Sequence, residues 1–244
     1  MIEVVNLSFS YPSRSPIFRG FNWRVERGEN WAIIGSSGCG KTTLLYLLAG
    51  LRHPAAGRIV MEGELLDKPR STIGLILQDY GLLPWATVLG NIELGLRLRK
   101  VSGSARKSVA QRWADELGIA SHGRQYPAQL SGGQRQRVAI ARTLALDPHI
   151  LLMDEPFSSL DALTRESLQD LMVSLSSDTG LTTVLVTHNI EEAVFLGNKI
   201  LVLGHPPIQS ACTIENPLAR TLDYRGNAAF HGKCDEVRRK VGEF

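Results

Sequence analysis

The chain has 244 residues, 43% hydrophobic and 21% charged, which supports a folded core and excludes wholesale disorder. Its net charge of +3, from 27 Lys and Arg against 24 Asp and Glu, is too small to indicate a nucleic-acid binder by itself. Cys39, Cys212 and Cys234 are too widely spaced for a disulfide framework or a zinc site, which favours a reducing compartment. Because we find neither a signal peptide nor an apolar run near the roughly 18 to 20 residues that cross a bilayer, we expect a cytosolic chain that spans no membrane.

Strands and turns are predicted in the first third of the chain. The strand candidates are 2–7, 21–28, 31–34, 58–62 and 73–77. A glycine-rich loop follows the strand at 31–34, and a helix at 43–49 follows that loop and ends before Gly50. A strand, a glycine loop and a helix in direct succession are typical of a phosphate-binding unit.

The middle of the chain is predicted to be helical. Residues 91–120, with the segment up to 129, are read as a helical insertion rich in Leu, Ala, Arg and Lys. Its basic residues could suggest an acidic partner, but we interpret them as a solvated helix face. They are Arg97, Arg99, Lys100, Arg106 and Lys107.

Helices and strands alternate in the second half of the chain. A helix after Ser131 precedes strands at 150–153, 182–186 and 199–203, with a helix between each pair of strands. This alternation predicts right-handed crossovers and a mainly parallel sheet, and hence an α/β fold. The pattern weakens after 204, and only a short helix near 236–241 is predicted in the tail.

The loop at 35–42 fits the phosphate-binding pattern G-x-x-x-x-G-K-S/T. It reads Gly35, Ser36, Ser37, Gly38, Cys39, Gly40, Lys41 and Thr42. Glycines let backbone N–H groups turn inward around an anion, and the following helix directs its positive end at the phosphates. Lys41 is expected to reach the β- and γ-phosphates and the Thr42 hydroxyl to bind Mg²⁺. The alternative, a glycine turn with an exposed lysine, is disfavoured by the strand before the loop and the helix after it.

Two acidic residues end the apolar strand at 150–153. Asp154 is expected near Mg²⁺, and Glu155 is expected to polarise the attacking water. Many strands end in an acid, so a solvated strand end is the alternative. The glycine loop makes the catalytic interpretation the stronger one.

The string at 130–134 is the most specific signal in the sequence. It reads Leu130, Ser131, Gly132, Gly133 and Gln134 and resembles the signature of ATP-binding cassette (ABC) ATPases. The resemblance covers roughly residues 1 to 205, with the motifs in the order of that family. It implies a P-loop NTPase fold with an N-terminal antiparallel β part and an inserted helical part. It also implies that two copies pair head to tail, each signature closing over the other's ATP.

The resemblance divides the single domain at 1–244 into parts. The RecA-like core with its antiparallel β part would take 1–90 and 145–205. The helical part with the signature would take 91–144, and a short C-terminal extension 206–244.

The resemblance also assigns roles outside these motifs. Tyr11 would stack on adenine, Gln78 would sense Mg²⁺ and water, and His188 would hydrogen-bond the γ-phosphate and hold Glu155 and the water in place. Ser159, Leu160 and Asp161 resemble the loop through which two cassettes communicate.

The implied site has three sets of residues. The catalytic set is Glu155, His188 and Gln78, and the metal set is Thr42, Gln78 and Asp154. The nucleotide-binding set is Tyr11, Gly35, Ser36, Ser37, Gly38, Cys39, Gly40, Lys41, Thr42, Thr43, Ser131, Gly132, Gly133, Gln134 and Asp161.

A second resemblance concerns the solute. Leu82, Leu83, Pro84 and Trp85 resemble importer cassettes for nitrate, sulfonate and taurine. An exposed apolar patch there would receive a short helix from a transmembrane permease near Gln78–Trp85 on the cytoplasmic face of the membrane. A separate solute-binding protein would serve the same transporter. The alternative is that Trp85 packs against the helical insertion.

Other function classes stay open at this point. A soluble ABC ATPase acting on nucleic acid or ribosomes is the main alternative, although this chain has one motif set and no long heptads. A small-molecule kinase would not explain the residues at 130–134, and a non-hydrolysing cassette would lack Glu155 or His188. We also expect a bulky thiol reagent on Cys39 to block ATP binding, unless Cys39 is merely a small residue tolerated for space.

Overall fold

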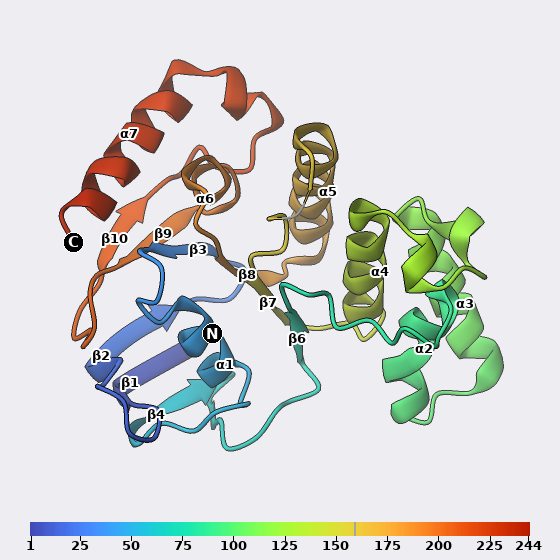
Figure 1. Cartoon of the computed structure of the whole chain (residues 1–244), viewed down its shortest axis with the longest axis horizontal. Helices are drawn as coiled ribbons and strands as arrows, with labels where there is room; N and C mark the ends of the chain where they lie inside the picture. The colour runs from blue at the N-terminus through green and yellow to red at the C-terminus, as the bar shows by residue number, and fades with distance from the viewer. Residues whose placement is uncertain (159) are drawn as a thin grey trace.

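The structure is a computed structural model that describes residues 1–158 and 160–244. Its fold consists of two β-sheets and two groups of helices (Figure 1). The strands are β1 (Ile2–Phe9), β2 (Phe18–Val25), β3 (Asn30–Gly35), β4 (Ala56–Met61), β5 (Glu64–Leu65), β6 (Ile73–Ile76), β7 (Ile150–Asp154), β8 (Thr182–Val186), β9 (Lys199–Leu203) and β10 (Cys212–Glu215). The α-helices are α1 (Lys41–Leu48), α2 (Val88–Leu98), α3 (Gly103–Glu116), α4 (Gly132–Leu144), α5 (Ala162–Thr179), α6 (Ile190–Leu196) and α7 (Ala228–Gly242).

The larger sheet has the strand order β10-β9-β3-β8-β7-β6. Only β10 runs antiparallel to its neighbour, and all the other pairs are parallel. The predicted mainly parallel sheet is therefore confirmed. Since parallel strands end at a common edge, the segments that follow β3, β6, β7 and β8 are brought together at one edge of this sheet.

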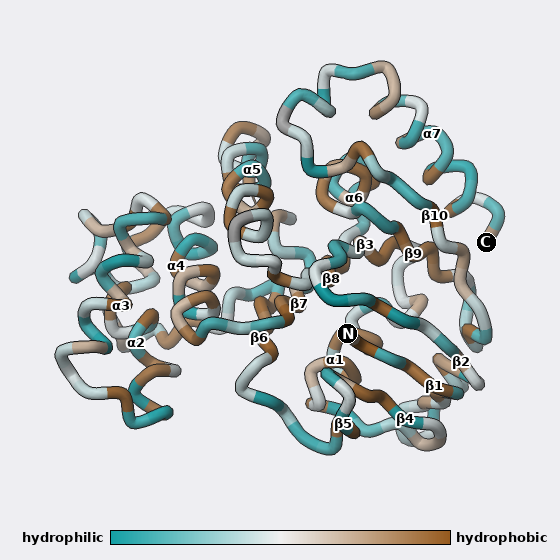
Figure 2. The backbone as a smooth tube through the Cα atoms, turned by 180° about the vertical axis from the view of Figure 1, so that it is seen from behind, coloured by the Kyte–Doolittle hydropathy of each residue, from teal (hydrophilic) through white to brown (hydrophobic). Residues whose placement is uncertain are grey.

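Strand β3 shows why the central strands are almost wholly apolar. Its side chains alternate between two hydrophobic clusters, with Ala32 and Ile34 in one and Trp31 and Ile33 in the other. Both faces of the sheet are covered, so the sequence needs apolar residues at every position. Figure 2 shows the result as hydrophobic stretches along β7 and β9.

The smaller sheet, of order β2-β1-β4-β5, is antiparallel and packs against α1. Ile2, Leu7 and Met61 of this sheet share a hydrophobic cluster with Leu44 and Leu48 of α1. This packing fixes the direction of α1, and therefore the place of the glycine loop before it. The predicted N-terminal antiparallel part of the P-loop fold is confirmed.

The helical part extends to one side of β6 (Figure 1). Helix α2 begins at Val88, three residues before the predicted start at 91, because the Thr87 hydroxyl caps it by accepting from the Gly90 N–H at 3.2 Å. The helical segment is broken after α2, where Lys100 has a positive φ of 58°. Helix α4 ends at Leu144, and Val88, Ile92 and Val138 contribute to a shared core.

The tail is more regular than the sequence pattern indicates. The predicted helix at 236–241 is part of α7, which starts at Ala228 and buries Phe230, Cys234 and Val237. Strand β10 was missed, because it is a four-residue edge strand in which only Ile214 is buried. Within the described residues, no helix combines the length and apolarity that a membrane crossing requires.

Candidate functional site

The glycine loop leaves β3 at Gly35 and enters α1 at Lys41. Gly38 and Gly40 have positive φ angles of 78° and 114°, which side chains other than glycine rarely adopt. A Cβ on Gly40 would also lie 2.5 Å from Ile17 Cγ2. Within the described residues, no side chain caps α1, so its first N–H groups are free to bind an anion.

A cavity of about 200 Å³ lies over this loop. Its lining residues are Ser37, Gly38, Gly40, Lys41, Thr42, Thr43 and Glu155. The Lys41 side chain is buried, and its Nζ donates to the carbonyl oxygens of Gly35 at 2.9 Å and Ser36 at 3.0 Å. The cavity therefore combines backbone donors with one fixed positive charge, an arrangement suited to phosphate groups.

Cys39 lies in the loop, but its side chain is buried in the core around α1. A Cβ on Gly35 would be 3.0 Å from Cys39 Sγ, which shows that the thiol points into the protein. Burial raises the pKa of this thiol, so little nucleophilic thiolate forms. Because the Cys39 side chain is buried, the structure favours the alternative of a small residue tolerated for space, and the effect of a bulky thiol reagent stays a prediction. The Cys39 N–H donates to Ser36 O at 3.3 Å.

Asp154, at the end of β7, meets the first turn of α1. The Thr42 hydroxyl donates to Asp154 Oδ1 at 3.1 Å. Burial raises the pKa of Asp154, and the hydrogen bond from Thr42 opposes that shift. Two of the three predicted metal-binding residues, Thr42 and Asp154, are thus in contact.

Glu155 is the meeting point of three strand ends. Its carboxylate Oε2 lies 3.1 Å from His188 Nδ1, which follows β8, and 3.5 Å from Gln78 Nε2, which follows β6. Glu155 itself has a positive φ of 45°, and its N–H donates to Val186 O at 2.9 Å. A non-glycine residue held in this conformation is strained, and such strain concentrates at functional sites. The structure therefore brings the three predicted catalytic residues together.

Tyr11 lies beside the start of α1. Its hydroxyl is 3.4 Å from Thr43 Oγ1, and Phe9 meets its ring edge-on with centroids 5.1 Å apart. The Arg52 guanidinium lies 5.9 Å from the ring centroid. A second hollow of about 530 Å³ continues from Thr42 and Tyr46 to Gln78, Asp154 and Ser158.

The signature residues form the start of α4, away from the cavity over α1 (Figure 1). The Ser131 hydroxyl accepts from the Gln134 N–H at 3.3 Å, and Gln134 Oε1 accepts from the Ser131 N–H at 2.8 Å. This capping box orders the turn. A Cβ on Gly133 would lie 2.6 Å from Thr164 Cγ2 in the first turn of α5, so a larger residue here would force the Thr164 side chain to move. One copy of the chain does not bring this signature to its own glycine loop.

The start of α5 carries the predicted communication loop. Asp161 caps the helix by accepting from the Thr164 N–H at 3.0 Å, and this hydrogen bond lowers the pKa of its carboxyl. Leu160 is buried in the core. Ser159, the first residue of that predicted loop, lies outside the described residues. Because Gly133 of α4 lies against Thr164 of α5, the starts of these two helices form one surface.

The segment after Gln78 is an ordered turn with an exposed tryptophan. The side chain of Trp85 is 74% exposed, so the alternative in which it packs against the helical insertion is wrong. The turn is organised by Asn91, which is fully buried and which sequence reasoning missed. Asn91 Oδ1 accepts from the Leu83 N–H at 2.8 Å, and its Nδ2 donates to the carbonyls of Ala86 and Thr87, each at 3.0 Å.

Arg142 of α4 is a second residue that sequence reasoning missed. It donates to the carbonyl oxygens of Gly81 at 2.5 Å and Tyr80 at 2.6 Å, which connects the segment after Gln78 to the helical part.

Of these two missed residues, Asn91 did have a signal in the sequence. It is a polar residue on the apolar face of α2 that Val88 and Ile92 form.

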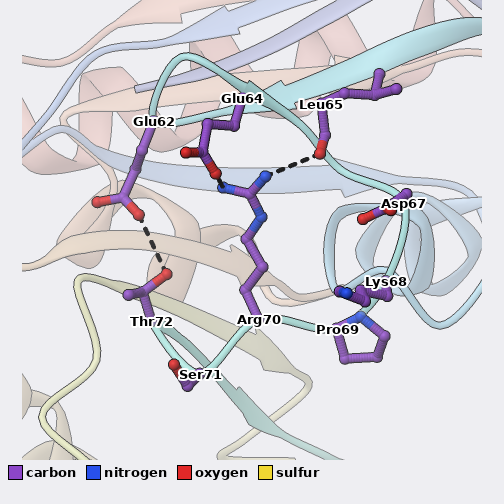
Figure 3. Close-up of a pocket in the computed structure, with 9 residues that line it drawn as sticks. All are labelled: Glu62, Glu64, Leu65, Asp67, Lys68, Pro69, Arg70, Ser71 and Thr72. Carbon is purple, nitrogen blue, oxygen red and sulfur yellow. Dashed lines mark hydrogen bonds and ion pairs between the residues drawn. The ribbon is translucent and has the colours of Figure 1, made fainter.

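A separate hollow of about 780 Å³ lies between β5 and β6, and among the described residues none of the predicted site residues lines it (Figure 3). Arg70 crosses it, pairing with Glu64 at 3.1 Å and donating to Leu65 O at 2.8 Å. The Thr72 hydroxyl donates to Glu62 at 3.1 Å. These side chains satisfy one another, so we place no chemistry in this hollow.

A glycine loop follows the parallel strand β3, an acid pair ends the parallel strand β7, and a glutamine and a histidine converge on the second acid, Glu155. These features define a P-loop nucleotide-binding ATPase. The family model for ABC transporters matches residues 18–158. The chain therefore belongs to the ABC transporter family. As a member it is an ATP-binding cassette that hydrolyses ATP.

Similar proteins agree with this assignment. The chain is 42% identical over 206 residues to the taurine import ATP-binding protein TauB of Pseudomonas aeruginosa, covering 84% of this chain and 78% of the relative. It is 41% identical over 207 residues to TauB of Escherichia coli, covering 85% and 81%.

Among solved structures, the dimeric ABC cassette MJ0796 bound to ADP and Pi matches with a TM-score of 0.78 and 30% identity, covering 88% of this chain and 98% of that one. The cassette cbiO1 of Clostridium perfringens matches with a TM-score of 0.78 and 27% identity, covering 88% of each chain.

Proposed function

We propose that this chain is the ATP-hydrolysing subunit of an importer for small solutes of the taurine, sulfonate and nitrate kind, working with separate membrane subunits. The observation that carries the proposal is the exposed Trp85 on a turn that buried Asn91 holds in one conformation. Tryptophan is enriched among the residues that dominate binding at protein interfaces, and a turn held in one conformation lowers the ordering cost of binding. The relatives named as taurine import proteins support the solute class.

The nucleotide is assigned to the cavity over the glycine loop. The backbone N–H groups of residues 35–43 and the Lys41 ammonium would bind the phosphates of ATP. Tyr11, which lies beside Thr43 and Arg52, would stack on the adenine ring. Lys41 would exchange its bonds to the loop carbonyls for bonds to phosphate oxygens.

The oxygen ligands around the second hollow, which begins at Thr42, fit Mg²⁺. A hydroxyl from Thr42 and a carboxylate from Asp154 are already in contact, and Gln78 adds an amide oxygen from the end of β6. In nucleotide sites Mg²⁺ typically binds only a few oxygen ligands from the protein, and phosphate oxygens and water complete its coordination shell. When bound, Mg²⁺ neutralises charge on the phosphates.

Hydrolysis is assigned to Glu155, Gln78 and His188. The Glu155 carboxylate would accept a hydrogen bond from the attacking water and orient it in line with the γ-phosphate. His188 and Gln78, at 3.1 Å and 3.5 Å from the same carboxylate oxygen, hold Glu155 in place. The rate gain then comes mainly from positioning and charge stabilisation.

The signature supports a head-to-tail pair of chains. Ser131, Gly132, Gly133 and Gln134 start α4 on a surface apart from the glycine loop. A second copy would present this helix start to the γ-phosphate, with Asp161 at the start of α5 beside it. Closing and opening this pair would drive the membrane subunits.

The remaining partners follow from the importer assignment. A transmembrane permease would dock on Gln78–Trp85 and place the chain at the cytoplasmic face of the membrane, and a solute-binding protein would deliver the solute. None of the relatives and structures reported above favours the nucleic-acid alternative.

The test is affinity isolation of the tagged chain from detergent-solubilised native membranes. We expect a stoichiometric polytopic partner with the wild-type chain and with Leu98→Ala, a control that changes an equally exposed apolar residue at the far end of α2. Trp85→Ala should lose most of that partner while ATP hydrolysis by the isolated chain stays within about twofold. Normal assembly of Trp85→Ala, or ribosomal proteins in place of a polytopic partner, would contradict the proposal.

A further inference from the structure

The C-terminal segment is fixed on α5 and α6. Buried Asn216 donates to Val194 O at 2.6 Å and Gly197 O at 3.0 Å. Arg220 donates to Val173 O at 3.2 Å and also to the Ser176 hydroxyl, and burial lowers its pKa to about 10. A segment held by buried polar contacts of this kind has one defined position.

Arg225 extends from this segment into the gap between α5 and α6. Its Nη2 donates to Gln169 Oε1 at 2.7 Å and its Nη1 to Asp170 Oδ1 at 2.6 Å. Its guanidinium carbon lies 3.4 Å from the centroid of the Phe195 ring. The two hydrogen bonds and the stacking on the Phe195 ring together restrict the guanidinium to one orientation.

Gln169 connects Arg225 to Glu192 through two hydrogen bonds, one to each residue. Gln169 is 4% exposed, and its Nε2 donates to Glu192 Oε1 at 3.2 Å. Glu192 is also 4% exposed, and burial raises the pKa of its carboxyl while hydrogen bonds from Thr187 and Gln169 oppose that shift. If Gln169 were displaced, a buried carboxylate would lose one of its two side-chain donors, which is costly.

Glu192 holds the loop at 187–189 from both sides. Its carboxylate accepts a hydrogen bond from the Thr187 side chain, and its backbone N–H donates to Asn189 Oδ1 at 3.1 Å. The Asn189 N–H in turn donates to Thr187 Oγ1 at 3.0 Å. His188, between these two residues, has a side chain that is 63% exposed and directed at Glu155.

We propose that Arg225 is a positioning residue for His188, acting through Gln169 and Glu192, so that the C-terminal segment forms part of the hydrolytic machinery. This inference rests on the proposed role of His188 in hydrolysis. The side chains lie beside a cavity of about 280 Å³ lined by Gln169, Glu192 and Arg225, so the loss of one member leaves room for the others to rearrange.

The test compares turnover and ATP affinity of the purified chain and its variants. Arg225→Ala should lower kcat about tenfold and leave ATP affinity within about twofold, since only the orientation of His188 changes. Gln169→Glu should lower kcat to a similar extent, because it keeps an acceptor for Arg225 but places a second carboxylate against Glu192. The control Arg238→Ala removes an exposed arginine of α7 that pairs with Asp235, and it should keep kcat within about twofold.

A double-mutant cycle separates positioning from general stability. In a His188→Ala background, Arg225→Ala should cause no further loss of kcat, and thermal unfolding identifies any variant that fails to fold. Full additivity with His188→Ala, or a normal kcat for folded Arg225→Ala, would overturn the inference alone. A normal kcat for His188→Ala would overturn the proposed role of His188 and this inference with it.

Discussion

Replacing Asn91 by Ala tests the account of the docking turn. Asn91 is fully buried, and its amide oxygen and two amide hydrogens support about three hydrogen bonds to the backbone at 83–87. At about 1 kcal/mol for each bond, the variant should lose about 3 kcal/mol of unfolding free energy. For a chain of this size that corresponds to a fall in Tm of roughly 6 to 12 °C.

The assay is thermal and urea unfolding of the purified chain, with ATP affinity measured on the same samples. Asn22→Ala is the matched control, because Asn22 is an exposed asparagine with backbone and side-chain hydrogen bonds on β2, and it should cost less than about 0.5 kcal/mol. ATP affinity of Asn91→Ala should stay within about twofold, since the turn lies outside the cavity that holds Lys41.

Assembly with the membrane partner should fall in Asn91→Ala, because Trp85 would lose its fixed direction. A loss of less than about 1 kcal/mol would refute the hydrogen-bond argument. An intact membrane complex in a destabilised variant would refute the link between the ordered turn and docking.

Three further predictions concern the glycine loop and Glu155. Lys41→Ala should weaken ATP binding more than tenfold by calorimetry, because its ammonium lies in the phosphate loop and donates to the carbonyl oxygens of Gly35 and Ser36, and wild-type affinity would be incompatible with phosphate binding there. Glu155→Gln should bind ATP normally but lose at least about 100-fold in turnover and accumulate as a dimer in light scattering with ATP; a monomer at high protein concentration would argue against the paired arrangement. Cys39 should react with a bulky maleimide only after unfolding, since its thiol is buried and its pKa raised; rapid labelling of the native chain, detected by mass spectrometry, would show that the loop opens.

Much of the site could be predicted because its signals are local in sequence. Glycines at the end of an apolar strand and acids at the end of another specify residues 35–42, Asp154 and Glu155. Parallel strands then bring such ends to one edge, and this is why Gln78 and His188, which are 110 positions apart, both contact Glu155.

The contacts that sequence reasoning missed join segments far apart in the chain. Arg142 meets Tyr80 across 62 positions, and Arg225 meets Gln169 across 56. An arginine that donates to backbone or amide oxygens carries no spacing signal, since any surface arginine looks the same in sequence. The position of Cys39 shows the converse limit, because a residue inside a binding motif can direct its side chain into the core.

ATP-driven uptake in proteoliposomes tests the central claim most directly. The chain would be reconstituted with the membrane subunits it captures and with their solute-binding protein, and uptake of labelled taurine, an alkanesulfonate and nitrate would be measured. We predict ATP-dependent accumulation of at least one of these solutes with the wild-type chain and none with Glu155→Gln. Equal accumulation with Glu155→Gln, or ATP hydrolysis without uptake of any of the three, would contradict the account.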